Sequence, residues 1–167
     1  MTNKYVLAVD AGSSGCRSLI FDLKGNLVSS AYQEWFYDLT PPEVAPMGKE
    51  FSPRKFWDII CRLIRESIRK ADIAPAAIVA VSSASQRQGT VFLDKKGKEL
   101  YAGPNTDIRA IMEGFAIDGE GGDEVYRITG HKPSLLFVPA RLKWFQANRP
   151  RIFEKIDSAL SIGDWIT

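Results

Sequence analysis

The chain predicts an α/β fold with a mixed sheet that opens as an antiparallel three-strand meander. Three strand-like segments come first, separated by short turns, and an amphipathic helix follows them. A short apolar segment after that helix suits a strand that runs parallel to a neighbour, because a helical crossover precedes it. With 167 residues, the chain is long enough for one substantial hydrophobic core.

The meander is predicted from the first 35 residues. Residues 5–9 form a buried apolar strand, and a Gly/Ser-rich turn over residues 10–16 leads into a second strand at residues 17–22. Lys24-Gly25-Asn26 marks another turn, after which residues 27–35 alternate as a third strand. Each short turn favours an antiparallel pair.

A helix is expected to begin at Ser52-Pro53, because serine is a favoured N-cap and proline suits the first helical position. Four apolar residues at helical spacing form its predicted buried face: Trp57, Ile60, Ile64 and Ile68. The preceding residues 36–51 contain prolines without a clear period and predict a surface loop.

The second half of the chain alternates between strands and helices. Residues 78–82 are apolar and fit a strand covered on both faces, and Lys95-Lys96-Gly97-Lys98 joins a hairpin of residues 90–93 and 99–101. Three helical stretches follow, then a strand and the opening of a last helix: residues 107–117, 123–128, 139–155 with a break near Pro150, 158–162 and 163–167.

Charge, cysteine spacing and the length of apolar runs exclude several classes of protein. The net charge is +2, with 22 basic and 20 acidic residues interspersed, so neither nucleic acid nor an anionic membrane is an expected partner. Cys16 and Cys61 match no metal-site spacing and no disulfide scaffold. No apolar run has the length of a membrane span or a signal-peptide core, and we therefore expect a cytoplasmic protein.

The clearest chemical signal lies in the turn after the first strand. It combines a carboxylate, two glycines, two hydroxyls and a guanidinium: Asp10, Gly12, Ser13, Ser14, Gly15 and Arg17. Glycines let backbone N–H groups approach an anion, hydroxyls and arginine donate to phosphate oxygens, and a carboxylate can hold hydrated Mg²⁺. From the residues alone, an anion cradle and an ordinary hairpin tip are equally supported.

A second polar segment follows the strand at residues 78–82, at the edge where α/β proteins place ligand contacts. Gln86, Arg87 and Gln88 offer donors and acceptors for a polyhydroxylated ligand, although a solvated loop explains them equally well. Asp107 can accept two hydroxyl protons or serve as a helix cap. His131 is expected to be a surface or turn residue, since no carboxylate or nucleophile stands near it in sequence.

Asp10-Ala-Gly-Ser-Ser-Gly-Cys-Arg17, followed by residues 21–26, resembles the opening of the FGGY carbohydrate kinases, within the actin-like ATPase superfamily. Further segments of the same family pattern recur in order: residues 85–89, 105–109, 124–130 and 139–144. Glu34-Trp35, Glu50-Phe51 and residues 161–165 are most similar to the autoinducer-2 kinase and xylulokinase-type branch.

This resemblance implies a ribonuclease H-like fold and a transferase that uses ATP and Mg²⁺ to phosphorylate a sugar, a polyol or an autoinducer-2-like hydroxylated small molecule. By position, Asp10 would organise Mg²⁺ and, with Arg17, serve catalysis. Four residues would face the phosphates of ATP: Gly12, Ser13, Ser14 and Arg17. Four others would bind substrate: Gln86, Arg87, Gln88 and Asp107.

The resemblance also bears on domain organisation. It places the general base and the C-terminal nucleotide-binding domain of the family beyond residue 167, so that residues 1–167 are expected to be part of the N-terminal kinase domain. The alternative is a truncated, non-catalytic module that binds a sugar or a protein. A partial domain would expose apolar surface and could form homo-oligomers.

Overall fold

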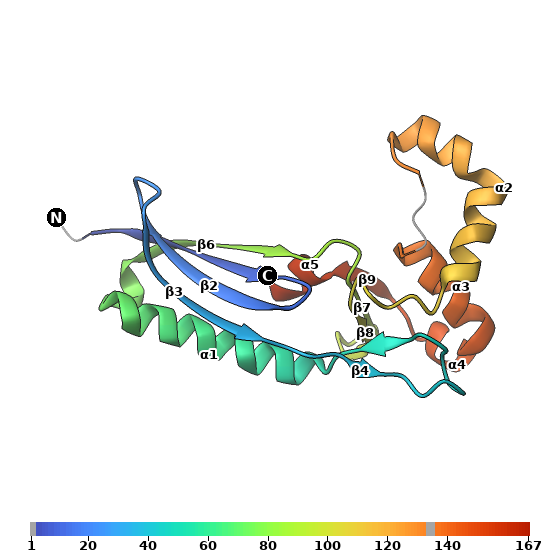
Figure 1. Ribbon diagram of the computed structural model, residues 1–167, viewed down its shortest axis with the longest axis horizontal. Helices are drawn as coiled ribbons and strands as arrows, with labels where there is room; N and C mark the ends of the chain where they lie inside the picture. The colour runs from blue at the N-terminus through green and yellow to red at the C-terminus, as the bar shows by residue number, and fades with distance from the viewer. Residues whose placement is uncertain (1–2, 133–135) are drawn as a thin grey trace. The chain divides into compact units, whose positions relative to one another are not determined.

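The computed structural model describes residues 3–132 and 136–167, which fall into two units (Figure 1). The first unit contains the residues up to Phe36, together with Phe51–Gln86 and Ile162–Thr167. The second contains Tyr37–Glu50 and Arg87–Ser161. Each unit has its own buried apolar side chains, whereas the chain length had suggested one shared core.

The first unit is built on a four-stranded mixed sheet with the strand order β3-β2-β1-β6 (Figure 1). The predicted meander is confirmed: β1 (Tyr5–Ala11), β2 (Gly15–Asp22) and β3 (Leu27–Glu34) pair antiparallel. The crossover to β6 (Ile78–Ser85) gives the predicted parallel pair with β1. The turn between β1 and β2 therefore lies close to the end of β6.

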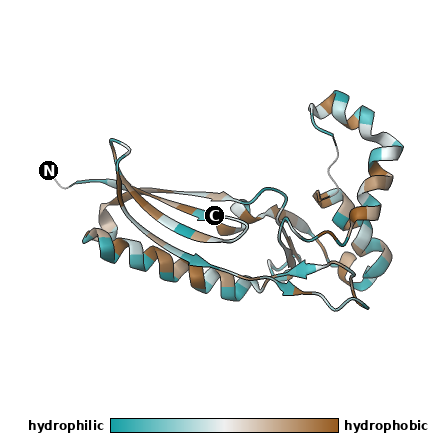
Figure 2. Ribbon diagram, in the orientation of Figure 1, coloured by the Kyte–Doolittle hydropathy of each residue, from teal (hydrophilic) through white to brown (hydrophobic). Residues whose placement is uncertain are grey.

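Helix α1 (Pro53–Ala71) packs on one face of this sheet, against β2 and β3. Ser52 is its N-cap, as predicted, and the Ser52 hydroxyl accepts a hydrogen bond from the Lys55 backbone at 3.4 Å. Polar and apolar residues alternate along the helix (Figure 2). Its last residues lead through a short 3₁₀ turn at Pro75–Ala77 into β6.

The predicted buried face of α1 was wrong by a small rotation. The buried residues are Phe56, Ile60, Leu63 and Ser67. Trp57 is instead 43% exposed. The Ser67 hydroxyl lies 2.7 Å from the Ser18 hydroxyl of β2, and this hydrogen bond allows a polar residue to face the sheet. The spacing of apolar residues does not reveal that Ser67 is buried.

Strand β6 is also less covered than its apolar sequence indicated. Val79 is 51% exposed and Val81 is 66% exposed. Within residues 3–132 and 136–167, β6 pairs with β1 on one side only, and α1 covers β2 and β3 instead. The expectation of a strand buried on both faces is therefore not met in the described chain.

The second unit contains a three-stranded antiparallel sheet with the order β8-β7-β9. The predicted hairpin is confirmed as β7 (Thr90–Leu93) and β8 (Glu99–Gly103), and β9 (Ser158–Ser161) pairs with the other side of β7. The stretch expected to be a loop contains two short paired strands, β4 (Asp38–Leu39) and β5 (Lys49–Glu50).

The predicted helices are present with shifted boundaries. Two expected stretches merge into α2 (Ile111–Thr129), which is kinked at Gly121. The expected break at Pro150 separates α3 (Val138–Asn148) from α4 (Pro150–Phe153). The last residues open a short helix, α5 (Ile162–Ile166), which belongs to the first unit.

Aromatic residues dominate the core of the second unit. Its buried cluster consists of Ala45, Phe92, Tyr101, Ala110, Ala140, Trp144 and Phe145. The two adjacent aromatics of α3, Trp144 and Phe145, thus belong to the core. In the parts of the chain that the structure describes, no helix is both long and apolar enough to cross a bilayer.

Candidate functional site

Asp10 and Arg17 lie directly opposite each other on β1 and β2, at the end of the strands where the Gly/Ser turn begins. One Arg17 guanidinium nitrogen lies 3.3 Å from an Asp10 carboxylate oxygen. The next residue, Ser18, contacts α1, so the alternation of the strands places Asp10 and Arg17 on the opposite sheet face. A carboxylate and a guanidinium therefore stand together beside the predicted phosphate turn.

The pair remains accessible. The side chains of Arg17 and Asp10 are 57% and 36% exposed, and the guanidinium also stacks over the Tyr32 ring at 5.2 Å. An exposed ion pair contributes only about 0–1 kcal/mol to stability. Arg17 can thus exchange its carboxylate partner for a phosphate oxygen at little cost to the fold.

Trp35 holds the turn between β1 and β2 through two hydrogen bonds. Its indole N–H donates to the Gly12 carbonyl at 3.1 Å, and its backbone N–H donates to the Ser14 carbonyl at 3.2 Å. The Gln86 side-chain amide also donates to the Gly12 carbonyl, at 3.4 Å. The indole is stacked on Phe56 of α1 at 4.0 Å between ring centroids. The two carbonyls are thereby oriented by fixed donors.

Sequence reasoning gave Trp35 no role in the site. The available signal was an aromatic residue with an N–H donor directly after the third strand, where the antiparallel register returns the chain to the first turn. Gln86, predicted to bind substrate, is buried and bonded to Gly12 within the first unit. Its observed contact supports the turn.

Gly15 is required by close approach of backbone. A Cβ atom there would lie 2.6 Å from the Gln33 carbonyl oxygen of β3, a separation that real Cβ atoms do not show. The hydroxyl residues Ser13 and Ser14 are exposed at the tip of the turn. Gly15 therefore permits the close packing of the backbone, and the two serines provide accessible hydroxyl groups.

Cys16 follows this turn and is fully buried. Burial, and secondarily the nearby Asp10 carboxylate, raises the pKa of the Cys16 thiol to about 12. A thiol that stays protonated at neutral pH is a poor nucleophile. Cys16 is therefore a packing residue of the first unit.

The donor set fits Mg²⁺ but not a metal held by protein alone. In residues 3–132 and 136–167, no group of three or more His, Cys, Asp or Glu side chains could hold an ion. Mg²⁺ commonly keeps several waters and takes one or two carboxylates together with substrate phosphates. Asp10 can supply one such carboxylate.

The second predicted segment, residues 86–88, passes from the first unit at Gln86 into the second unit at Arg87. Arg87 is exposed, and Arg87 and Gln88 line a cavity of about 350 Å³. The other residues that line the cavity are Gly89, Thr90, His131, Phe137, Val138, Pro139 and Ser161. His131, predicted to be a surface or turn residue, thus shares a cavity with two predicted substrate-binding residues. His131 follows the C-terminal end of α2, and no local sequence pattern connects it with residues 87–89.

Asp107 is buried in the second unit and is not a helix cap, because α2 begins at Ile111. Its carboxylate accepts hydrogen bonds from the Tyr101 hydroxyl, from Arg109 Nε at 2.8 Å and from the Lys49 backbone at 3.1 Å. Burial raises the pKa of Tyr101 well above its ordinary value, so this phenol remains a donor. These partners disfavour the predicted contact between Asp107 and substrate.

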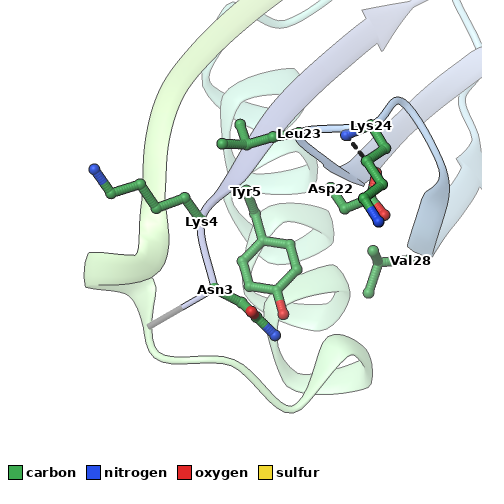
Figure 3. A pocket seen from close by; sticks show the side chains of 7 residues that line it. All are labelled: Asn3, Lys4, Tyr5, Asp22, Leu23, Lys24 and Val28. Atoms are coloured by element: carbon green, nitrogen blue, oxygen red, sulfur yellow. Dashed lines mark hydrogen bonds between the residues drawn. The ribbon is translucent and has the colours of Figure 1, made fainter. Parts of the chain in front are cut away.

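A larger cavity, of about 790 Å³, lies at the opposite end of β1 from Asp10 (Figure 3). Its lining includes Tyr5, Leu23 and Val28. The carboxylate of Asp22 there accepts bonds from the backbone of Lys24 and Asn26 and is engaged in the turn. The larger of these two cavities therefore does not contain the residues predicted to bind phosphate or substrate.

Similar solved structures identify the fold. The structure of a xyloylose kinase from Brucella ovis matches with a TM-score of 0.87 and 23% identity, and the match covers 97% of this chain and 33% of that one. A ligand-bound xylulose kinase from Lactobacillus acidophilus gives 0.84 and 21%, with 98% and 32% covered. The ribonuclease H-like, actin-like ATPase fold is therefore confirmed.

Residues 5–167 match the N-terminal domain of the FGGY family of carbohydrate kinases, and the chain belongs to this family. An autoinducer-2 kinase from Salmonella typhimurium is 37% identical over 166 residues, which are 97% of this chain and 31% of that protein. An Escherichia coli O139:H28 relative of the same description is 36% identical over the same share. The chain thus spans about a third of the length of the curated relatives it matches.

Proposed function

We propose that the protein containing this chain transfers the terminal phosphoryl group of ATP to a hydroxyl of a sugar, a polyol or an autoinducer-2-like small molecule. The observation that carries the proposal is the Asp10–Arg17 pair beside a turn whose carbonyls are held by Trp35. Family membership supports the reaction class. The similarity to autoinducer-2 kinases favours an autoinducer-2-like substrate.

In this proposal the turn receives the phosphates. Ser13 and Ser14 supply donors at the exposed tip, Gly12 and Gly15 keep the backbone close, and Arg17 neutralises charge on the phosphate oxygens. Asp10 would hold Mg²⁺, which when bound neutralises phosphate charge. Phosphoryl transfer depends mainly on positioning and on such charge neutralisation.

The reaction forms one bond and breaks another. The substrate hydroxyl oxygen bonds to the terminal phosphorus, the bond from that phosphorus to the bridging oxygen breaks, and ADP leaves. The hydroxyl proton passes to a base, which the family pattern places beyond residue 167. We propose that residues 1–167 form part of the N-terminal domain, and that the nucleotide lobe lies in the remaining length of such proteins.

Arg87 and Gln88 would bind the substrate from their cavity in the second unit. A guanidinium and a primary amide can each bond to more than one hydroxyl. Gln86 and Asp107 would act indirectly, because their observed partners are protein groups. A cytoplasmic location and assembly into homo-oligomers belong to the same proposal.

The test is ATP turnover by the complete protein with Mg²⁺ against a panel of sugars, polyols and autoinducer-2 precursors. We expect Asp10→Asn to lower kcat by roughly 10²-fold with little change in the KM for the hydroxylated substrate. Arg87→Ala should chiefly raise that KM. No turnover with any panel member, or equal effects of both variants on kcat alone, would contradict the proposal.

A further inference from the structure

Arg141 is the largest fully buried side chain of the molecule's described residues, with 0% of its surface exposed. It projects from α3 into the interior of the second unit, next to the segment that contains Gln88. Buried arginine is rare unless its donors are used. Arg141 therefore has a defined task in this unit.

Its guanidinium joins two separate segments. One terminal nitrogen donates to the Gln88 carbonyl at 2.7 Å, and the other donates to the Pro104 carbonyl at 2.7 Å. The second nitrogen also lies 3.4 Å from the Asp107 carbonyl. Arg141 thus ties the segment of residues 87–89 to the loop that precedes α2.

Gln88 needs such support because its backbone is left-handed, with φ at +66°. This region is sterically unfavourable for a residue with a Cβ atom and is held only when surrounding contacts fix it. The bond from Arg141 to the Gln88 carbonyl is such a contact. Gln88, which carries this left-handed bend, and its neighbour Arg87 both line the cavity.

We infer that Arg141 is a positioning residue for substrate binding: it holds Gln88 in its left-handed conformation and so sets the affinity for the hydroxylated substrate. The inference rests on the proposed function. Arg141 donates to backbone carbonyls, lies 4.0 Å from the buried Asp107 carboxylate and is outside the lining of the cavity, so its direct link to the cavity is the Gln88 carbonyl. Nucleotide binding, assigned to the other unit, should be independent of it.

The first experiment compares Arg141→Lys and Arg141→Met in the complete protein. Lysine keeps the charge but offers a single donor group, whereas the planar guanidinium reaches two carbonyls at once. We expect the KM for the hydroxylated substrate to rise about tenfold in Arg141→Lys and further in Arg141→Met, with kcat and the KM for ATP within about twofold of wild type.

The matched control is Ile152→Ala in α4. Ile152 packs against the core of the same unit and is not among the residues that line the cavity of Arg87 and Gln88. It should lower the melting temperature as much as the Arg141 variants do, while leaving the substrate KM unchanged. If Ile152→Ala raises the KM equally, Arg141 acts only through general stability and the inference is wrong.

A second pair of variants leaves Arg141 in place and serves if the Arg141 variants do not fold. Gln88→Gly and Gln88→Val both lack the amide, but glycine accepts a positive φ and valine strongly disfavours it. We expect the substrate KM of Gln88→Val to exceed that of Gln88→Gly several-fold. Equal KM values would overturn the inference. A wild-type protein without any turnover would instead count against the proposed function itself.

Discussion

At the scale of single residues, the site depends on side chains that hold backbone groups. Trp35 and Arg141 do this in different units: the indole holds the Gly12 carbonyl and the guanidinium holds the Gln88 carbonyl. Neither residue is accessible enough to meet a ligand directly, because both are buried. Several of the residues predicted from chemistry alone, such as Ser13, Ser14 and Arg87, are exposed and lie in the segments that these two support.

Trp35→Phe separates the hydrogen bond from the aromatic stacking. Phenylalanine can keep the contact with Phe56 but has no N–H for the Gly12 carbonyl. We expect a loss of about 1 kcal/mol in the free energy of unfolding by urea denaturation, the usual magnitude for one hydrogen bond. In the complete protein the KM for ATP should rise several-fold.

Trp57→Phe is the control for this variant. Trp57 lies on the same unit, is 43% exposed and packs edge-on against Trp165. Its replacement should leave the KM for ATP unchanged. If both variants shift that KM equally, the indole of Trp35 has no special role at the turn.

At the scale of elements, the sequence was informative wherever a local signal decides the structure. Turn residues such as Gly25 and Gly97, both with positive φ, marked the hairpins correctly. Pro150 marked the break between α3 and α4. On the buried face of α1, Ser67 was missed because its bond to Ser18 is to a partner 49 residues away in the chain.

In the candidate site too, the features set by local sequence were predicted and those set by long-range contacts were missed. The Asp10–Arg17 pair follows from residue types around one tight turn, and the sequence located it. His131, which follows α2, lines the same cavity as Arg87 although the two residues are far apart in the sequence. The Asp107 carboxylate is buried among partners that include Tyr101, Arg109 and the Lys49 backbone. Such long-range contacts leave no local pattern to find.

The start of α1 offers a direct test at this scale. Ser52→Ala removes the acceptor for the Lys55 backbone N–H, and we expect it to lower the free energy of unfolding by about 1 kcal/mol. Ser52→Asp keeps an acceptor at the N-cap and should retain wild-type stability. Urea denaturation followed by circular dichroism measures both. Equal stability of all three proteins would show that this cap contributes nothing.

At the scale of the whole molecule, the two units carry different parts of the proposed reaction. The first unit holds the turn with Asp10 and Arg17, and the second holds the cavity with Arg87 and Gln88. Phosphoryl transfer in general depends largely on the positioning of its reacting groups. The continuous chain from β6 into β7 passes directly from one part to the other.

The surface of β6 predicts how the 167-residue chain behaves by itself. Among the residues described, this strand has a free pairing side, and it exposes the apolar side chains of Val79 and Val81. An uncovered apolar edge strand is a template for pairing with a second copy. We therefore expect the 167-residue chain to associate as its concentration rises, as measured by sedimentation equilibrium.

Val81→Lys should reduce this association, because a charge on an edge strand opposes pairing between copies. Its melting temperature should stay close to that of wild type, since Val81 is 66% exposed and loses little packing. Leu23→Lys, at a residue 64% exposed in the turn after β2, is the matched control and should associate as wild type does. A wild-type chain that remains monomeric throughout the concentration range, or a Leu23 variant that matches the Val81 variant, would show that β6 does not mediate the contact.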